Sequence, residues 1–566
     1  MLPKVKRRIL IRRVIIILAI FILLDAGLKF IRMVPLSVQS QEKGYLEINP
    51  NLAKRFYPQL KHDEPEDAPS LCFKEERDST TVRIVCVGDE LTAGFPYIAH
   101  TIFPSQLQAL LNRAAQDTTF EVINLGIPGF TSDILTSLLL EILQLEPQIV
   151  CLNPGSFEFA GNLISENEPV IYMSELGKFV MQYLVPDAKS VGPAYPYLVN
   201  LSHLFSLTQD SLIEAEEFIK KRNKVMQNFR KNWERVIRKF QEKNIRVVLS
   251  NLPVNDSKQL LNNISTTEPD LINEINLMLS DLAFQTKTPL VRLDSIITEN
   301  DLINLCHNSL PLNKLYINAA GQHQWAVGVF NAIKQIENDK ITFLPLTSVA
   351  RDSILNENVL DLEIGRQALI EMSVRTMQAQ DTLVLPVSQL EQTIIDWAKE
   401  VIAMPSYWPR AQMEMAHYWE ARRDWQQAGR HYLAVAFSYP RDYAANYNLG
   451  YFCERNRLFL PAAMFLEKAL KIRPEKFPLY KRIGNLYLIS DKAEKSASYL
   501  EKALDYYHNR QVTYSRAELF EMNLALTEAY INLRKNDLAR ERLEFILTTN
   551  PEDYRVRRLK RYLDAL

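Results

Sequence analysis

One acidic residue lies where the chain is expected to carry a nucleophile. The apolar run 82–87 ends at Gly88, and Asp89 and Glu90 follow directly. A strand that passes through a tight turn into a helix presents the first side chain of that helix for chemistry. A carboxylate such as Glu90 can attack an activated sugar or phosphoryl centre, but it is a poor substitute for the activated hydroxyl of acyl transfer. The turn therefore places an acidic side chain, and not a hydroxyl, where a side chain could take part in chemistry.

Three further short segments carry residue types that bear on such a site. They are 124–132 (NLGIPGFTS, with Gly129), 155–159 (GSFEF, with Phe157) and 313–316 (NKLY, from Asn313 to Tyr316). A glycine backbone N–H can help to bind a developing oxyanion, whereas a phenyl ring offers no N–H. A tyrosine, with a reference pKa near 10, cannot shuttle protons near pH 7 as an imidazole does.

Alternating strands and helices are needed to bring these segments together. Strand-like apolar runs occur at 82–87, 121–125, 148–152, 246–251 and 289–293, and helical stretches at 103–115, 132–144, 212–243, 270–285 and 322–336. This alternation is typical of an α/β domain with a parallel sheet. The aromatic-rich stretch 162–211 is an insertion that could cap the end of the sheet where ligands bind in open α/β folds.

Together the four segments resemble the four sequence blocks of the SGNH or GDSL hydrolases. The resemblance covers roughly residues 82–336 and implies a three-layer α/β/α, flavodoxin-like sandwich with a parallel sheet. That family uses a serine after Gly-Asp, an oxyanion-hole glycine, an asparagine amide, and an aspartate with a histidine. At the matching positions this chain has, in the same order, Glu90, Gly129, Phe157, Asn313 and Tyr316.

These replacements predict a catalytically inactive domain, a pseudoenzyme of the esterase class. Loss of one oxyanion-hole donor alone typically lowers the rate about 100- to 1000-fold. We therefore assign no catalytic residue and regard Glu90, Phe157, Asn313 and Tyr316 as degenerate positions. The pocket is expected to bind a ligand through a smaller set: Asp89, Glu90, Gly129, Phe157 and Tyr316.

Other polar residues near the four segments offer alternative chemistry. They are Ser132, Ser156, Glu158, His307 and His323. Neither histidine holds the family position, and neither serine has an evident base partner, so we expect the serines to be cap or turn residues. Glu158 with Asp89 or Glu90 could form a carboxylate pair for sugar chemistry, but no second signal supports it, and we expect Asp89 to hydrogen-bond the turn.

The first 35 residues predict a membrane anchor. Six Lys or Arg residues lie within the first 13 positions, and the uncharged apolar run 14–24 follows. Counting 9–31, with its flanking cations reaching the interface, the stretch is long enough to span. The basic end is expected to stay cytoplasmic and the remaining chain outside. A cleaved signal peptide is the rival interpretation, although no convincing cleavage site follows.

The C-terminal part contains an internal repeat of 34 residues. Gly450 and Gly484 lie 34 residues apart, and so do Pro440 and Pro474. The repeat occurs in four copies, and the fourth is displaced by nine residues. This period resembles tetratricopeptide repeats, in which small residues let paired helices approach. Such arrays form a solenoid that commonly binds a protein or peptide on its concave face. Candidate exposed residues on the first helices are Asn446, Tyr447, Tyr480 and Asn485.

These patterns divide the chain into five parts. They are 1–35 (tail and anchor), 36–80 (spacer), 81–337 (SGNH-like domain), 338–405 (linker and helices capping the array) and 406–566 (repeats). With 66 Lys and Arg against 67 Asp and Glu, the composition does not indicate nucleic-acid binding. The five cysteines form no CxxC or metal-ligand spacing, and we expect no cofactor.

Two functional hypotheses follow, from different classes. The first is a membrane-anchored extracytoplasmic scaffold on the periplasmic side of a bacterial inner membrane. It would recruit partners through its repeats in the assembly or modification of an envelope polysaccharide, with an acylated glycan or small ligand in the pocket. The second is an SGNH-type esterase or acyltransferase that acts on acylated glycans or lipids by an altered mechanism. An adaptor with reversed, cytoplasm-facing orientation is a third possibility.

Overall fold

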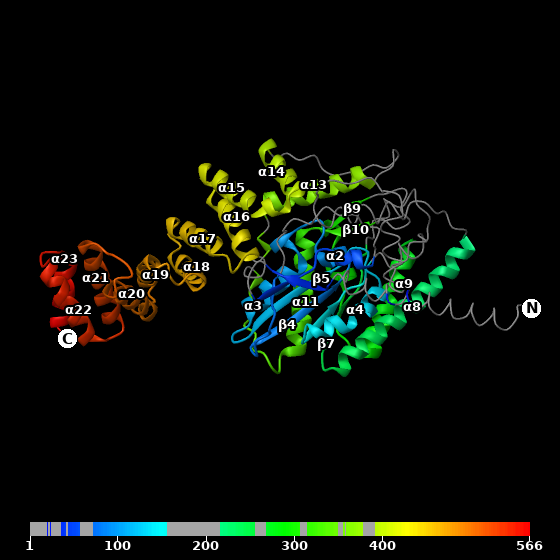
Figure 1. Cartoon of the computed structure of the whole chain (residues 1–566), viewed down its shortest axis with the longest axis horizontal. Helices are drawn as coiled ribbons and strands as arrows, with labels where there is room; N and C mark the ends of the chain where they lie inside the picture. The colour runs from blue at the N-terminus through cyan, green and yellow to red at the C-terminus, as the bar shows by residue number, and fades with distance from the viewer. Residues whose placement is uncertain are drawn as a thin grey trace, which may run out of the picture. The chain divides into compact units, whose positions relative to one another are not determined.

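The computed structural model divides into two compact units, residues Met1–Ala411 and Gln412–Leu566 (Figure 1). Apart from the single residues 20 and 23, the structure describes 35–40, 44–56, 72–155, 215–254, 268–305, 314–348, 355–356, 358–376 and 391–565. Among these residues no helix is long and apolar enough to cross a membrane. The segment predicted as an anchor lies almost entirely outside them, and the anchor stays a prediction.

A five-stranded parallel sheet forms the centre of the first unit. Its strands are β4 (Thr81–Gly88), β5 (Thr119–Gly126), β6 (Ile149–Leu152), β7 (Arg246–Ser250) and β8 (Leu290–Val291). Their order is β5-β4-β6-β7-β8. In order of sequence this is 2-1-3-4-5, the flavodoxin-like order, which confirms the predicted parallel α/β fold. The strands are apolar on both faces because helices cover both faces.

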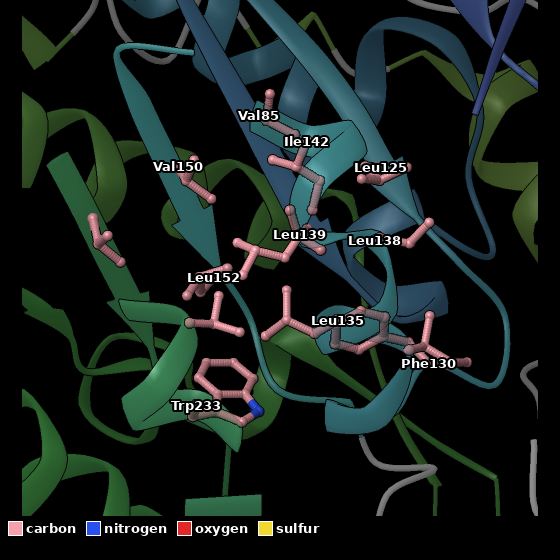
Figure 2. Close-up of a cluster of buried hydrophobic side chains, with 14 of the residues drawn as sticks. Val85, Leu125, Phe130, Leu135, Leu138, Leu139, Ile142, Val150, Leu152 and Trp233 are labelled. Atoms are coloured by element: carbon pink, nitrogen blue, oxygen red, sulfur yellow. The ribbon is translucent and has the colours of Figure 1, made fainter. Parts of the chain in front are cut away.

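Two groups of helices cover the sheet. The first is α4 (Ser132–Gln144), α8 (Ala215–Glu242) and α9 (Glu268–Thr286), and the second is α3 (Phe103–Ala114) and α11 (Ala319–Glu337). The first group shares one core cluster with Val85 and Val87 (Figure 2). On the opposite face, Phe103 of α3 stacks on Trp325 of α11 at 4.3 Å, and the Trp325 Nε1–H donates to the Ser250 hydroxyl of β7 at 3.0 Å.

The region expected to be a spacer, 36–80, contributes a small antiparallel sheet to the first unit. Its strands are β1 (Ser37–Gln39), β2 (Tyr45–Ile48) and β3 (Phe73–Lys74), with the short helix η1 (Leu52–Arg55) between β2 and β3. Phe73 is fully buried and belongs to the core of the α/β domain. Arg55 of η1 forms an ion pair with Glu141 of α4 at 2.6 Å. A few apolar residues thus attach this mostly polar segment to the α/β domain. The composition of the segment alone does not reveal this attachment.

A second small sheet lies before α11. Strands β9 (Leu302–Leu305) and β10 (Lys314–Ile317) form an antiparallel pair in which Tyr316 faces Ile303 in register. Neither strand was predicted from the sequence, because each run is only four residues long. The following helix begins at Ala319, and the capping side chain of Asn318 accepts a hydrogen bond from the N–H of Gly321.

Two further helices follow the α/β core, α13 (Val359–Thr376) and α14 (Gln392–Ala403), which pack on each other. We expected them to cap the repeat array. Both fall within the first unit, and their role as caps of the array stays a prediction. On α13, Gly365 is close enough to Tyr97 that an added Cβ would lie 2.6 Å from its ring.

The second unit is a series of antiparallel helices. It contains the end of α15 (Trp408–Ala421), then α16 (Trp425–Ser438), α17 (Tyr443–Arg455), α18 (Phe459–Ile472), α19 (Pro478–Ile489), α20 (Ala493–His508), α21 (Arg516–Asn532), α22 (Asn536–Thr549) and α23 (Tyr554–Asp564). Cβ atoms at Gly450 and Gly484 would lie 2.8 and 2.6 Å from Leu466 and Leu500 respectively. The same contact thus recurs after 34 residues.

The repeat surface differs from prediction at two of its four candidate residues. Asn446 and Tyr480 are buried, while Tyr447 and Asn485 are half-buried. The Asn446 side-chain amide donates to the backbone carbonyls of Pro440 and Asp442, at 3.0 and 2.8 Å. The amide therefore stabilises the turn before α17. The prediction that Asn446 is exposed was wrong because its polar side chain serves this buried turn.

Candidate functional site

The four sequence blocks bring their residues to the carboxyl ends of β4, β5 and β6. The chain leaves β4 toward β5 on one side and returns to β6 on the other, so the switch point of the sheet lies between β4 and β6. In open α/β sheets this is where ligands bind. Asp89 follows β4 and Asn153 follows β6 at this place.

Glu90 is the first residue of the short helix α2 (Glu90–Ala93), and it is buried. The carboxylate of Asp89 caps this helix by accepting the N–H of Leu91 at 3.0 Å. This is the predicted hydrogen bond to the turn. A Cβ on Gly88 would lie 2.1 Å from the Thr92 hydroxyl, so only glycine permits the turn to close this tightly.

The second block packs directly against α2. A Cβ on Gly126, the last residue of β5, would lie 2.2 Å from the backbone nitrogen of Ala93. The chain then turns at Gly129, whose φ of +73° lies in the left-handed region that favours glycine. Thr131 caps the following helix α4. Gly129 therefore lies in the turn between β5 and α4, and its role at an oxyanion stays a prediction.

The third block reaches the same place through Gly155. A Cβ on Gly155 would lie 2.9 Å from the Asp89 Cβ and 3.0 Å from the carbonyl oxygen of Phe130. The third block thus contacts both the first and the second. Phe157 and Glu158 lie outside the described residues, and their predicted roles stay predictions.

The fourth block places Tyr316 beside the two carboxylates. Tyr316 is buried, and its pKa is raised well above 10 by burial first, and then by the charges of Glu90 and Asp89. Its ring meets that of Phe95 edge-on at 5.1 Å. The phenol is therefore a neutral donor at any ordinary pH. Asn313 lies outside the described residues.

The described histidines of this domain point to other partners. His323 of α11 contacts the Gln106 side chain of α3 at 2.9 Å through Nδ1. His100 contacts the carbonyl oxygen of Asn356 at 3.2 Å. The third candidate, His307, lies outside the described part of the chain. The described contacts of His323 and His100 thus hold α3, α11 and the backbone at Asn356 together.

Of the two candidate serines, the structure describes Ser132. The Ser132 hydroxyl, at the start of α4, accepts a hydrogen bond from the Asn232 side-chain amide of α8 at 3.0 Å. It therefore helps to hold α4 against α8. Ser156 lies just beyond the described residues of β6.

Sequence reasoning missed Asn153. Its side chain is buried, and neither its oxygen nor its nitrogen has a hydrogen-bond partner among the described residues. Its backbone N–H donates to the carbonyl of Val87 at 2.9 Å, which places it beside the β4 turn. Buried amides normally find partners. A polar residue directly after a central strand at the switch point was the signal that could have found it.

In chemical terms the site combines two buried carboxylates with a neutral phenol and a buried amide. It can accept and donate hydrogen bonds, but the described residues include no activated hydroxyl. No group of His, Cys, Asp and Glu in the described parts has the geometry to hold a metal ion.

Comparisons with known proteins give two groups of similar solved structures. No family model matches the chain, and no curated protein matches it. The chain is similar to solved structures of SGNH or GDSL lipolytic hydrolases and of the tetratricopeptide protein MamA.

Three of these structures illustrate the two groups. A lipolytic protein described as G-D-S-L family, from Desulfitobacterium hafniense, is 14% identical; the match covers 44% of this chain and 99% of that one, with TM-score 0.26. The lipase/acylhydrolase from Enterococcus faecalis is 16% identical over 47% and 100%, with TM-score 0.28. MamA from Desulfovibrio magneticus is 16% identical over 28% and 84%, with TM-score 0.23. The fold assignment itself rests on the strand order and the helical repeat.

Proposed function

We propose that this protein is a membrane-anchored scaffold whose SGNH-like domain is catalytically inactive and whose repeats recruit a partner. The observation that carries the first half is the pairing at the site. In the sequence resemblance, Glu90 aligns with the nucleophile of the hydrolases and Tyr316 with their proton shuttle. A carboxylate facing a neutral phenol forms a stable hydrogen-bonding environment, whereas acyl transfer needs a hydroxyl activated by a base.

The burial of the site supports the same proposal. Asp89, Glu90 and Tyr316 are each about 1% exposed. A phenol whose pKa is raised well above 10 cannot take a proton from a water molecule or a leaving group near pH 7. In this proposal Tyr316 stands in place of the base and Glu90 in place of the nucleophile. Restoring one of the two groups alone would therefore leave the other absent.

The repeat unit supports the recruiting half of the proposal. Stacked helical repeats leave an extended surface that commonly binds a protein or peptide. Helix α17 carries three stacked tyrosines. The ring centroids of Tyr443 and Tyr447 are 5.7 Å apart, and those of Tyr447 and Tyr451 are 6.3 Å apart. Aromatic side chains are enriched at protein interfaces because they bury much area at low entropic cost.

The cellular setting is proposed from the N-terminal sequence. The basic N-terminus followed by an apolar run motivates an uncleaved anchor with the bulk of the chain on the periplasmic side of a bacterial inner membrane. The further link to an envelope polysaccharide and its acyl groups comes from the hydrolase resemblance alone, and is an analogy of fold.

An ester hydrolysis assay tests the inactive-domain proposal. Purified full-length protein, Glu90→Ala and the exposed-site control Glu242→Ala are incubated with acetyl and longer acyl esters. We expect the same background rate for all three. Turnover by the natural chain that is lost in Glu90→Ala but kept in Glu242→Ala would contradict the proposal and favour an esterase or acyltransferase of altered mechanism.

A further inference from the structure

The segment from Gly94 to Thr101 joins the helix of Glu90 to α3 and touches two different parts of the first unit. One part is the candidate site, and the other is the helix α13 that follows the α/β core. We infer that α13 is an internal clamp that holds this segment, so that release of α13 would loosen the turn that carries Glu90. The inference concerns how the site is held, and it stands whether or not the site turns over an ester.

The contacts toward the site run through the backbone of Glu90. Its carbonyl accepts the N–H groups of Gly94 at 3.1 Å and of Phe95 at 2.9 Å. The Phe95 ring also packs edge-on against Tyr316. A displacement of the segment therefore removes hydrogen bonds from Glu90 and the aromatic neighbour of Tyr316 together.

The contacts toward α13 begin with Tyr97. This ring is buried and lies so close to Gly365 of α13 that an added Cβ there would be 2.6 Å from it. Interiors packed this closely do not accept an extra methyl group without a shift of the backbone. Gly365 therefore makes the close approach of α13 to the segment possible.

A buried polar cluster fixes the same docking. The Nε2 atom of His100, in the short helix η2 (Ala99–Thr101), lies 3.7 Å from an Asp361 carboxylate oxygen of α13. The other oxygen of Asp361 accepts the Trp408 indole N–H at 2.8 Å. All three side chains are at most 4% exposed. A buried carboxylate is costly without its partners, so intermediate positions of α13 are disfavoured and the cluster forms or separates as a unit.

This cluster also connects the clamp to the repeats along the chain. Trp408 is the first residue of α15, and α15 continues past Ala411, where the repeat unit begins. A partner that alters the start of α15 would therefore act on Asp361 and, through His100, on the segment beside the site. Coupling of this kind requires one element with two arrangements, and docked or released α13 is that element.

Hydrogen exchange on the full-length protein tests the clamp. Gly365→Leu should force α13 away from Tyr97, while Leu362→Ala, at an exposed position of the same helix, is the matched control. We expect amides of 94–101 to exchange at least about tenfold faster in Gly365→Leu, since the overpacked contact opens more often. Amides of β5 and β7 and all amides of the control should keep their rates.

Faster exchange confined to α13 would overturn the inference. If Gly365→Leu instead opens the entire α/β domain, Trp408→Phe decides, because it keeps an aromatic ring while it removes the indole donor to Asp361 and part of the ring volume. There we expect about fivefold faster exchange in 94–101, the change that follows from the loss of one buried hydrogen bond. Unchanged exchange of that segment in Trp408→Phe would equally reject the clamp.

Discussion

At the scale of single residues, Tyr316 contributes to the candidate site through both its ring and its hydroxyl. Tyr316 is fully enclosed, with its hydroxyl close to Glu90 and Asp89 and its ring against Phe95. The ring supplies apolar packing and the hydroxyl supplies a neutral donor beside two carboxylates. These two contributions can be separated by substitution.

We expect Tyr316→Ala to lower the free energy of unfolding of the first unit by about 3–5 kcal/mol, because it leaves a cavity of aromatic size. Tyr316→Phe keeps the ring and should cost about 1–2 kcal/mol, the effect of one buried hydrogen-bonding group. Urea titration of both variants measures the difference. Equal losses in the two variants would show that the hydroxyl, not the ring, is what holds this position.

The residue scale also shows how far sequence reasoning reaches. The segments that contain Gly88, Gly129 and Gly155 were identified from their resemblance to the hydrolase blocks, and in the structure Gly155 lies against Asp89 and Phe130, and Gly126 against Ala93. Asn153 was missed and Asn446 was misjudged. The role of each of these polar residues depends on the buried backbone groups near it in the fold. The neighbouring residues in the sequence do not reveal those groups.

At the scale of elements, the segment before β4 is attached to the sheet by a buried ion pair. The Arg83 guanidinium of β4 donates to Glu121 of β5 at 2.9 Å and to the carbonyl of Lys74 of β3 at 2.6 Å. Glu121 in turn accepts the Lys74 N–H at 2.7 Å. The main strands were predicted from their apolar runs. The attachment of β3 was not, because it depends on charges distant in sequence.

We expect Arg83→Met to cost about 3–5 kcal/mol of unfolding free energy, because it leaves the Glu121 carboxylate buried and unpaired. The double variant Arg83→Met with Glu121→Leu should recover part of that loss, since no charge then remains buried. Lys74→Met, which removes only the exposed pair with Asp78, should cost less than about 1 kcal/mol. Chemical denaturation of the three variants measures this, and a double variant no more stable than Arg83→Met would refute the account.

At the scale of the whole molecule, the two units have different polar interiors and should respond differently to alkali. In the repeat unit, burial is the main cause that raises the pKa of Tyr432, Tyr480 and Tyr514 to about 12. In the unfolded chain these phenols ionise near pH 10. Their contribution to stability is therefore complete below about pH 10 and is lost as the pH rises through about 12.

We expect the repeat unit to lose about 1 kcal/mol per buried tyrosine between pH 10 and pH 11. The triple variant Tyr432→Phe, Tyr480→Phe, Tyr514→Phe should show a weaker pH dependence, and the exposed-site variant Tyr554→Phe should behave as the natural chain. Urea titrations of helical content at pH 8, 10 and 11 give the slopes. An unchanged slope in the triple variant would mean that other groups cause the alkaline loss.

The recurring contact of Gly450 with Leu466 and of Gly484 with Leu500 has a consequence for how this protein can change over time. Because this contact lies within one helix pair, α17 with α18 and α19 with α20, each copy carries its own internal packing, and whole copies can be duplicated or excised in frame. The reach of the array can thus evolve by gene-level copying of 34 codons, while the hydrolase-like part remains untouched.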